Sequence, residues 1–84
     1  MTVVNEGIVF GEHLRELRTA RNLTQTELAD RCDSNRQFIG DLERGLKVPS
    51  LTMVLRLANA LDCTACDLVV VFDQDRGGAK RKRR

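Results

Sequence analysis

The chain has 84 residues, of which 42% are hydrophobic and 31% charged, and this is the size and composition of one small globular domain. Its net charge is +2, but five of its 14 basic residues lie within residues 80–84, and the remaining nine are outnumbered by 12 acidic residues. The rest of the chain is therefore mildly acidic, which excludes a uniformly basic surface for unspecific nucleic-acid binding and requires locally clustered positive charge for any DNA contact.

The sequence indicates neither a membrane segment nor export. Its longest apolar run, residues 68–72, is far shorter than the roughly 20 residues that span a bilayer. The first seven residues, Met-Thr-Val-Val-Asn-Glu-Gly, contain no basic leader and no apolar stretch of signal-peptide length. We therefore expect a cytoplasmic protein.

The cysteines and the single histidine offer little chemistry. Three cysteines, Cys32, Cys63 and Cys66, are an odd number, which favours free thiols over a disulfide framework. Cys63 and Cys66 have the spacing of a redox motif or half a zinc site, but there is no second pair and His13 is remote in sequence. Since nucleophile motifs and phosphate-binding glycine loops are also missing, we expect no metal, no cofactor and no enzyme activity.

The first predicted element is a helix after a short arm. Residues 1–7 show little pattern and are expected to form a loose N-terminal arm. Over residues 8–21, apolar side chains then recur at i, i+4 and i+7: Phe10, Leu14 and Leu17. Asn22 is suited to end this helix, because asparagine tolerates the left-handed backbone found after many helices.

Two short helices follow with a tight turn between them. Thr24 and Glu27 form the pattern of a capping box, which predicts the start of a helix. Three turn-forming residues at 33–35 end it, with Asp33 expected to take a positive φ and Asn35 to cap the next helix. That third helix is expected to stop at Gly45.

The last predicted helices are less uniform. Ser50, directly after Pro49, is expected to cap a fourth helix over residues 51–61. Thr64 is expected to cap a short fifth helix from residue 65 to about 69. The β-branched run at 69–72 competes as a strand, and the sequence leaves both possibilities open.

The pair of helices within residues 24–44 has the geometry of a helix-turn-helix, in which the second helix enters the major groove of DNA. Ala29 supplies the small side chain that the crossing of the two helices needs. Ile39 and Leu42 are expected to face the core. The remaining positions of the third helix are expected to point outward: Arg36, Gln37, Gly40, Asp41 and Arg44.

Four segments resemble, in order and spacing, the phage-repressor-like Cro/CI/Xre helix-turn-helix family. They are residues 14–29 (LRELRTARNLTQTELA), 39–45 (IGDLERG), 49–51 (PSL) and 55–61 (LRLANAL). The resemblance covers about residues 8–68. Gly77, Gly78 and the basic run after them predict a disordered tail over residues 73–84. The resemblance implies an all-α, compact five-helix, lambda-repressor-like domain over residues 8–72, in which residues 69–72 remain a possible short C-terminal strand. It also implies a transcriptional regulator, for example a repressor, that binds a palindromic operator in double-stranded DNA as a homodimer.

The resemblance also implies roles for single residues. Three side chains of the third helix would read base edges: Arg36, Gln37 and Asp41. Arginine suits guanine, glutamine suits adenine, and a carboxylate must either accept from cytosine or pair with a nearby arginine. Five residues would contact the DNA backbone: Thr24, Gln25, Asn35, Arg44 and Lys47. Arg18 and Glu43 would form a structural ion pair between the first helix and the end of the third.

A second resemblance keeps another function open. Residues 36–45 are also similar to HipB-type antitoxins, which bind a partner toxin and repress their own operon. In those proteins a C-terminal strand helps to pair two subunits, and residues 69–72 are candidates for such a strand. The alternative therefore predicts a toxin protein as a partner and dimerisation by strand pairing.

Overall fold

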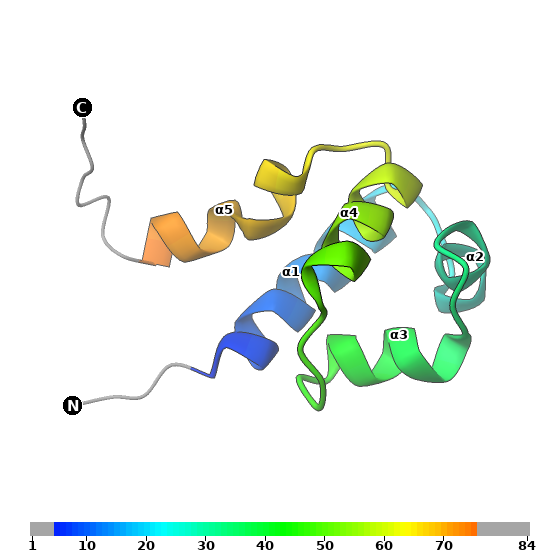
Figure 1. Ribbon diagram of the computed structural model, residues 1–84, viewed down its shortest axis with the longest axis horizontal. Helices are drawn as coiled ribbons and strands as arrows, with labels where there is room; N and C mark the ends of the chain where they lie inside the picture. Colours follow the sequence, from blue (N-terminus) through cyan, green and yellow to red (C-terminus); the bar gives the residue numbers. More distant parts are fainter. Residues whose placement is uncertain (1–4, 76–84) are drawn as a thin grey trace.

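The computed structural model describes residues 5–75, and within them the chain forms five α-helices and no strand (Figure 1). The helices are α1 (Glu6–Ala20), α2 (Gln25–Arg31), α3 (Arg36–Glu43), α4 (Leu51–Ala60) and α5 (Ala65–Asp75). Helix α1 packs against α3 and α5, while α2 packs against α3 and α4. The predicted all-α, five-helix architecture is confirmed.

Side-chain caps set most of the helix starts at the predicted residues. Thr24 Oγ1 accepts from Glu27 N at 3.0 Å, and a Glu27 carboxylate oxygen accepts from Thr24 N at 2.8 Å. Asn35 and Ser50 each accept from the backbone N–H three residues on. Thr64 caps α5 by accepting from the backbone N–H of residue 67. These predictions are confirmed, and they show that local hydrogen bonding fixes where four of the helices begin.

Helix α1 begins earlier than predicted. Its first residue is Glu6, so two residues of the segment predicted as a loose arm are helical. The physical reason is Asn5, whose Oδ1 accepts from Ile8 N at 3.1 Å and so caps the helix. Residues 1–4 lie outside the described residues.

The possible C-terminal strand at residues 69–72 is wrong. This segment is the middle of α5, which continues through Asp75 and so includes three residues assigned to the tail. Leu68 is completely buried and Phe72, four residues on, packs against the same core, so tertiary packing overrides the β-branched propensity between them. The basic run at 80–84 lies outside the described residues.

Left-handed backbone conformations close three turns at predicted positions. Asn22, Asp33 and Gly45 have φ values of 58°, 60° and 77°. Asp62, with φ 57°, ends α4 in the same way and was not anticipated. Because aspartate and asparagine tolerate this conformation better than most residues, three turns form here without glycine.

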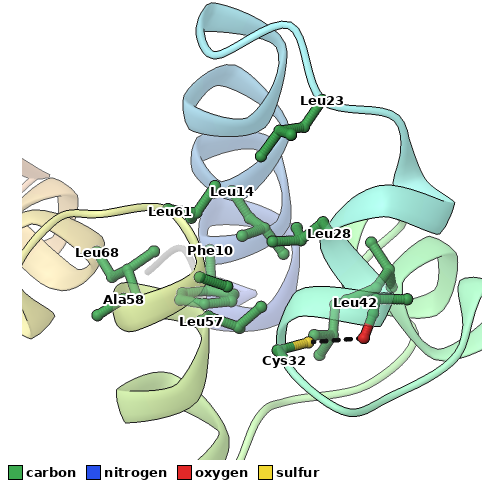
Figure 2. Close-up of a cluster of buried hydrophobic side chains, with 13 residues drawn as sticks. Phe10, Leu14, Leu23, Leu28, Cys32, Leu42, Leu57, Ala58, Leu61 and Leu68 are labelled. Atoms are coloured by element: carbon green, nitrogen blue, oxygen red, sulfur yellow. Dashed lines mark hydrogen bonds between the residues drawn. The ribbon is translucent and has the colours of Figure 1, made fainter.

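One apolar core joins all five helices. Figure 2 shows Leu14 of α1 and Leu28 of α2 pointing toward one another inside it. Cys32 belongs to this core, and its Sγ donates to the backbone oxygen of Ala29 at 3.7 Å. Within the part of the chain that the structure describes, no helix is long and apolar enough to cross a membrane.

Candidate nucleic-acid interface

One side of α3 faces the core and the other faces solvent. Ile39 and Leu42 are completely buried, and α2 crosses nearby with Ala29 also buried. Figure 1 shows α3 at an edge of the bundle, with α2 beside its first turn. We call the polar residues on its outer side and in the following loop the α3 face: Arg36, Gln37, Asp41, Arg44 and Lys47.

The first turn of α3 presents two exposed polar side chains, Arg36 and Gln37. The cap residue Asn35 uses its Oδ1 to accept from Phe38 N at 2.8 Å. The backbone N–H groups of residues 36 and 37 have no acceptor within the helix itself, because the first N–H groups of any helix lack one. This end of α3 therefore combines two exposed polar side chains with backbone N–H groups of the kind that suit a phosphate.

Asp41 differs from its predicted orientation. Its side chain is only 12% exposed, because neighbouring donors cover it. Oδ1 accepts from Gln37 Nε2 at 3.1 Å and from Arg44 Nη2 at 2.7 Å, while Lys47 Nζ lies 3.6 Å from Oδ2. We call these four residues the Asp41 cluster. The expectation that Asp41 points freely outward is wrong, whereas base contact by Asp41 stays a prediction.

Gly40 is also covered, contrary to the expectation that it faces outward. A Cβ built at this position would lie 3.4 Å from Arg44 Nη1 and 3.8 Å from Gln25 Nε2. These are ordinary van der Waals distances, so an alanine side chain would fit here beside the guanidinium that Arg44 directs toward Asp41.

Phe38 contacts the α3 face through Lys47, and sequence reasoning missed this contact. Its ring is partly buried against the core, and Lys47 Nζ lies 5.5 Å from the ring centroid, within the range of a cation–π contact. The two residues help to line a hollow of about 310 Å³, together with Ser34, Asn35, Gln37 and Met53. An aromatic residue nine positions before a lysine gives no local pattern from which this contact could be foreseen.

A second cluster of polar side chains surrounds Glu43 at the C-terminal end of α3. Arg18 Nε and Nη2 donate to the two carboxylate oxygens of Glu43 at 2.6 and 3.1 Å, and Gln25 Nε2 donates to the same carboxylate at 3.1 Å. The side chains of Arg18 and Glu43 are 11% and 5% exposed. Arg18 also donates to the backbone oxygen of Leu23 at 2.7 Å. The structure thus brings together the residues expected to form the ion pair, and we call them with Gln25 the Glu43 cluster.

Two of the residues predicted to contact the DNA backbone are engaged as caps. The side-chain oxygens of Thr24 and Asn35 accept from their own helices, so they position the starts of α2 and α3. The two hydrogen bonds with Thr24 lower the pKa of the Glu27 carboxyl below its usual range. Both caps therefore stabilise the N-terminal turns of the two helices.

The guanidinium of Arg21 donates hydrogen bonds to two backbone carbonyl groups. Its Nε donates to the backbone oxygen of Leu61 at 2.5 Å, and its Nη1 donates to that of Leu17 at 3.0 Å. The guanidinium therefore joins the end of α1 to the end of α4, where carbonyl groups lack partners within the helix.

The three cysteines of this chain differ in their exposure to solvent. Cys32 is buried, Cys63 partly buried and Cys66 exposed, and all three are free thiols. Burial raises the pKa of the Cys32 and Cys63 thiols, which reduces the reactive thiolate form. Among residues 5–75 no group of three or more metal-ligating side chains comes together.

Comparison with known proteins connects this geometry with DNA regulators. A family model described as Helix-turn-helix matches residues 14–68. The control protein C.BamHI of Bacillus amyloliquefaciens is 35% identical over 66 residues, which are 77% of this chain and 82% of that protein. An immunity repressor protein of Bacillus phage phi105 is 35% identical over 54 residues, which are 64% of this chain and 38% of the repressor.

Solved structures show the same arrangement of helices. The restriction-modification controller protein C.AhdI from Aeromonas hydrophila is 42% identical with a TM-score of 0.75, over 77% of this chain and 98% of that one. The clp gene regulator ClgR from Corynebacterium glutamicum has a TM-score of 0.77 at 24% identity, over 84% of this chain and 76% of that one, a likeness of fold alone. The matched regions contain α2 and α3 together with the helices that support them.

Proposed function

The chain belongs to the helix-turn-helix family of DNA-binding transcriptional regulators, and on that premise we propose that it binds a palindromic operator as a homodimer through the α3 face. The family is one of regulators rather than enzymes. The observation that carries the proposal is the exposed first turn of α3, where Arg36 and Gln37 project from a helix whose opposite side is completely buried. An α-helix with side chains, about 10–12 Å wide, fits the major groove of B-DNA.

Arg36 and Gln37 are proposed to read base edges. A guanidinium donates two hydrogen bonds to O6 and N7 of guanine, and a glutamine amide pairs with N6 and N7 of adenine. Both side chains are exposed at the start of α3, which is the part of a recognition helix that reaches furthest into the groove. The operator is therefore expected to contain a guanine and an adenine within each half-site.

Five residues are proposed to hold the domain against the DNA backbone: Thr24, Gln25, Asn35, Arg44 and Lys47. Arg44 and Lys47 supply positive charge at the far end of the α3 face, with side chains 58% and 54% exposed. Asn35 and Thr24 hold the N-termini of α3 and α2 in place, where backbone N–H groups suit phosphate oxygens. Gln25, already bonded to Glu43, braces α3 at the crossing of the two helices.

Dimerisation is proposed because one α3 face is a small positive surface on an otherwise acidic body. Four apolar residues in the loop after α3 and in α4 are between 54% and 74% exposed: Leu46, Val48, Leu51 and Leu55. Leu51 and Leu55 lie one turn apart on the same side of α4. A second copy covering these side chains would bury apolar area and give the assembly two α3 faces related by two-fold symmetry.

The setting of the regulator is proposed from its relatives. C.AhdI is described as a restriction-modification controller, which favours a similar role in controlling genes beside its own. The antitoxin alternative predicted dimerisation by a strand for which residues 69–72 were the candidates, and that segment is helical. We therefore propose no toxin partner. A restriction-modification gene pair next to this gene would agree with the controller role, and an adjoining toxin-like kinase gene would contradict it.

Footprinting of the purified protein on the DNA upstream of its own gene tests the proposal. We expect protection of two half-sites whose centres lie about 34 Å apart, one helical turn, as the symmetry of a dimer requires. Sedimentation of the free and DNA-bound protein gives the number of chains in the same complex. Absence of protection at low salt, or protection of one half-site by one chain, would contradict the proposal.

A further inference from the structure

Asp41 is surrounded by residues that the proposed function assigns to DNA. Its carboxylate oxygens bond or lie close to Gln37, Arg44 and Lys47, at i−4, i+3 and i+6 along the chain. A carboxylate presents to these donors the same kind of anionic oxygen that a DNA phosphate presents. In the free protein, Asp41 therefore occupies the positions that phosphates would take on Arg44 and Lys47.

Within the Asp41 cluster, the two cationic side chains, Arg44 and Lys47, differ from the Gln37 amide in how freely they can leave Asp41. Arg44 and Lys47 are more than half exposed, so their long side chains can turn outward to a phosphate. Gln37 donates to Asp41 through Nε2, which turns its Oε1 away from the carboxylate. The second hydrogen on Nε2 and the free Oε1 together form the donor and acceptor pair that an adenine edge requires.

These two observations lead to different consequences for matching and non-matching DNA. A matching site accepts the amide in the orientation that Asp41 already gives it, so the Asp41 to Gln37 bond can remain. A non-matching site offers phosphates but no partner for the amide. Its phosphates therefore draw Arg44 and Lys47 away from Asp41, and this poorly solvated carboxylate is left without its cation partners.

We propose that Asp41 is a positioning residue which orients Gln37 for base reading and competes with phosphate for Arg44 and Lys47, so that it weakens binding to non-matching DNA. This inference rests on the proposed contact between the α3 face and DNA. It assigns the role of Asp41 to its contacts with other side chains rather than to a base of its own.

The test compares Asp41→Asn with wild type on a random-sequence duplex and on the footprinted upstream fragment, by fluorescence anisotropy from 50 to 300 mM KCl. Asp62→Asn is the matched control. It removes the same charge from the turn between α4 and α5, where asparagine also tolerates the positive φ of this position. A melting temperature measured for each variant shows whether that variant is folded. Asp41→Ser is a second variant without the charge, for use if Asp41→Asn does not fold.

We expect Asp41→Asn to bind the random duplex about eightfold more tightly at 0.1 M salt and to steepen the salt dependence by about 0.9, the contribution of one additional phosphate contact. Affinity for the upstream fragment should rise less, so the ratio of the two affinities falls. Adding Arg44→Gln should remove most of the effect of Asp41→Asn, because the carboxylate acts through that arginine.

Two results would overturn the inference. One is an Asp41→Asn protein whose affinity for the random duplex and salt dependence equal those of Asp62→Asn. The other is a loss of binding confined to one base pair of the upstream fragment, which would make Asp41 a base reader. Wild-type protein without preference for the upstream fragment would contradict the proposed operator instead, and the random-duplex comparison would still decide the role of Asp41.

Discussion

Two carboxylates lie two residues apart on α3 and have nearly the same partners. Glu43 binds an arginine and a glutamine, and so does Asp41. The partners of Glu43 come from α1 and α2, 25 and 18 residues away, and the ion pair is almost completely buried. The partners of Asp41 come from the same helix and the loop after it, and its cations remain more than half exposed.

This difference in partners suits the Glu43 cluster to stabilising the fold and the Asp41 cluster to recognising a ligand. The Glu43 cluster joins three helices, so exchange of its partners would require α1, α2 and α3 to separate. The Asp41 cluster joins residues that α3 already holds together, so its side chains can exchange partners while the fold stays intact. The chemistry is alike in the two clusters, and sequence separation and burial decide what each can do.

The largest loss of stability is expected from a substitution that breaks the Glu43 cluster. Glu43→Ala leaves the buried Arg18 without its carboxylate and should lower the free energy of unfolding by roughly 3–5 kcal/mol. Asp41→Ala, the matched change on the outer side, should cost less than about 1 kcal/mol because its cations remain solvated. Urea unfolding followed by circular dichroism measures both, and equal losses would contradict the distinction between the two clusters.

The next prediction compares the stability cost of an added methyl group at two glycines, Gly11 of α1, which packs against α3, and Gly40 of α3 itself. A Cβ at Gly11 on α1 would collide with the backbone oxygens of Leu42 and Glu43, so Gly11→Ala should cost about 2–3 kcal/mol as the helices separate. Gly40→Ala meets only the ends of flexible side chains and gains up to about 1 kcal/mol of helix propensity. Thermal melting compares the variants, and the reverse order of stability would mean that α3 packs differently.

Base reading by the α3 face predicts changes in specificity without changes in stability. Arg36→Ala or Gln37→Ala should each cost roughly 1–3 kcal/mol of discrimination at one base pair, because a bidentate contact is lost. Their stabilities should stay within about 0.5 kcal/mol of wild type, since both side chains are exposed. Binding to a set of singly substituted operators gives the answer, and an equal loss for every sequence would assign these residues to phosphates.

The smallest effect concerns the cap that begins α2. The pKa of Glu27 is lowered in the folded state, so its ionised form stabilises the fold at neutral pH. That contribution declines as pH falls below about 4.5, the ordinary pKa of a glutamate, and is gone once pH passes below the folded value. The melting temperature of Glu27→Gln should therefore approach that of wild type between about pH 6 and pH 3. A difference that stays constant over this range would show that the carboxylate charge does not act through the cap.

The sequence predicted what depends on neighbouring residues. Thr24, Asn35 and Ser50 cap their helices through hydrogen bonds to backbone N–H groups only three residues away. Asn22 and Asp33 take a positive φ for local steric reasons. The helical state of residues 69–72 could not be predicted in this way. It depends on burial of the flanking Leu68 and on packing of Phe72 against residues distant in sequence.

The candidate site was predicted unevenly for the same reason. The spacing of Gln37, Asp41 and Arg44 at i, i+4 and i+7 was visible in the sequence and already indicates that these side chains meet. Pairing of Asp41 with a nearby arginine was one of two expectations for this carboxylate, and Arg44 is that arginine. Its burial was missed because residue 41 was expected to point outward from the recognition helix. The contact between Phe38 and Lys47 depends on the path of the loop after α3, which no local pattern determines.

An NMR titration with the upstream DNA fragment tests the distinction between the two clusters most directly. The side-chain signals of Gln37 Nε2 and Arg18 Nε report on the Asp41 and Glu43 clusters in one spectrum. The Gln37 signal should shift and saturate with DNA while the Arg18 signal stays in place. A shift of Arg18 as large as that of Gln37, or an unchanged Gln37 signal in a saturated complex, would contradict the assignment of the α3 face to DNA recognition.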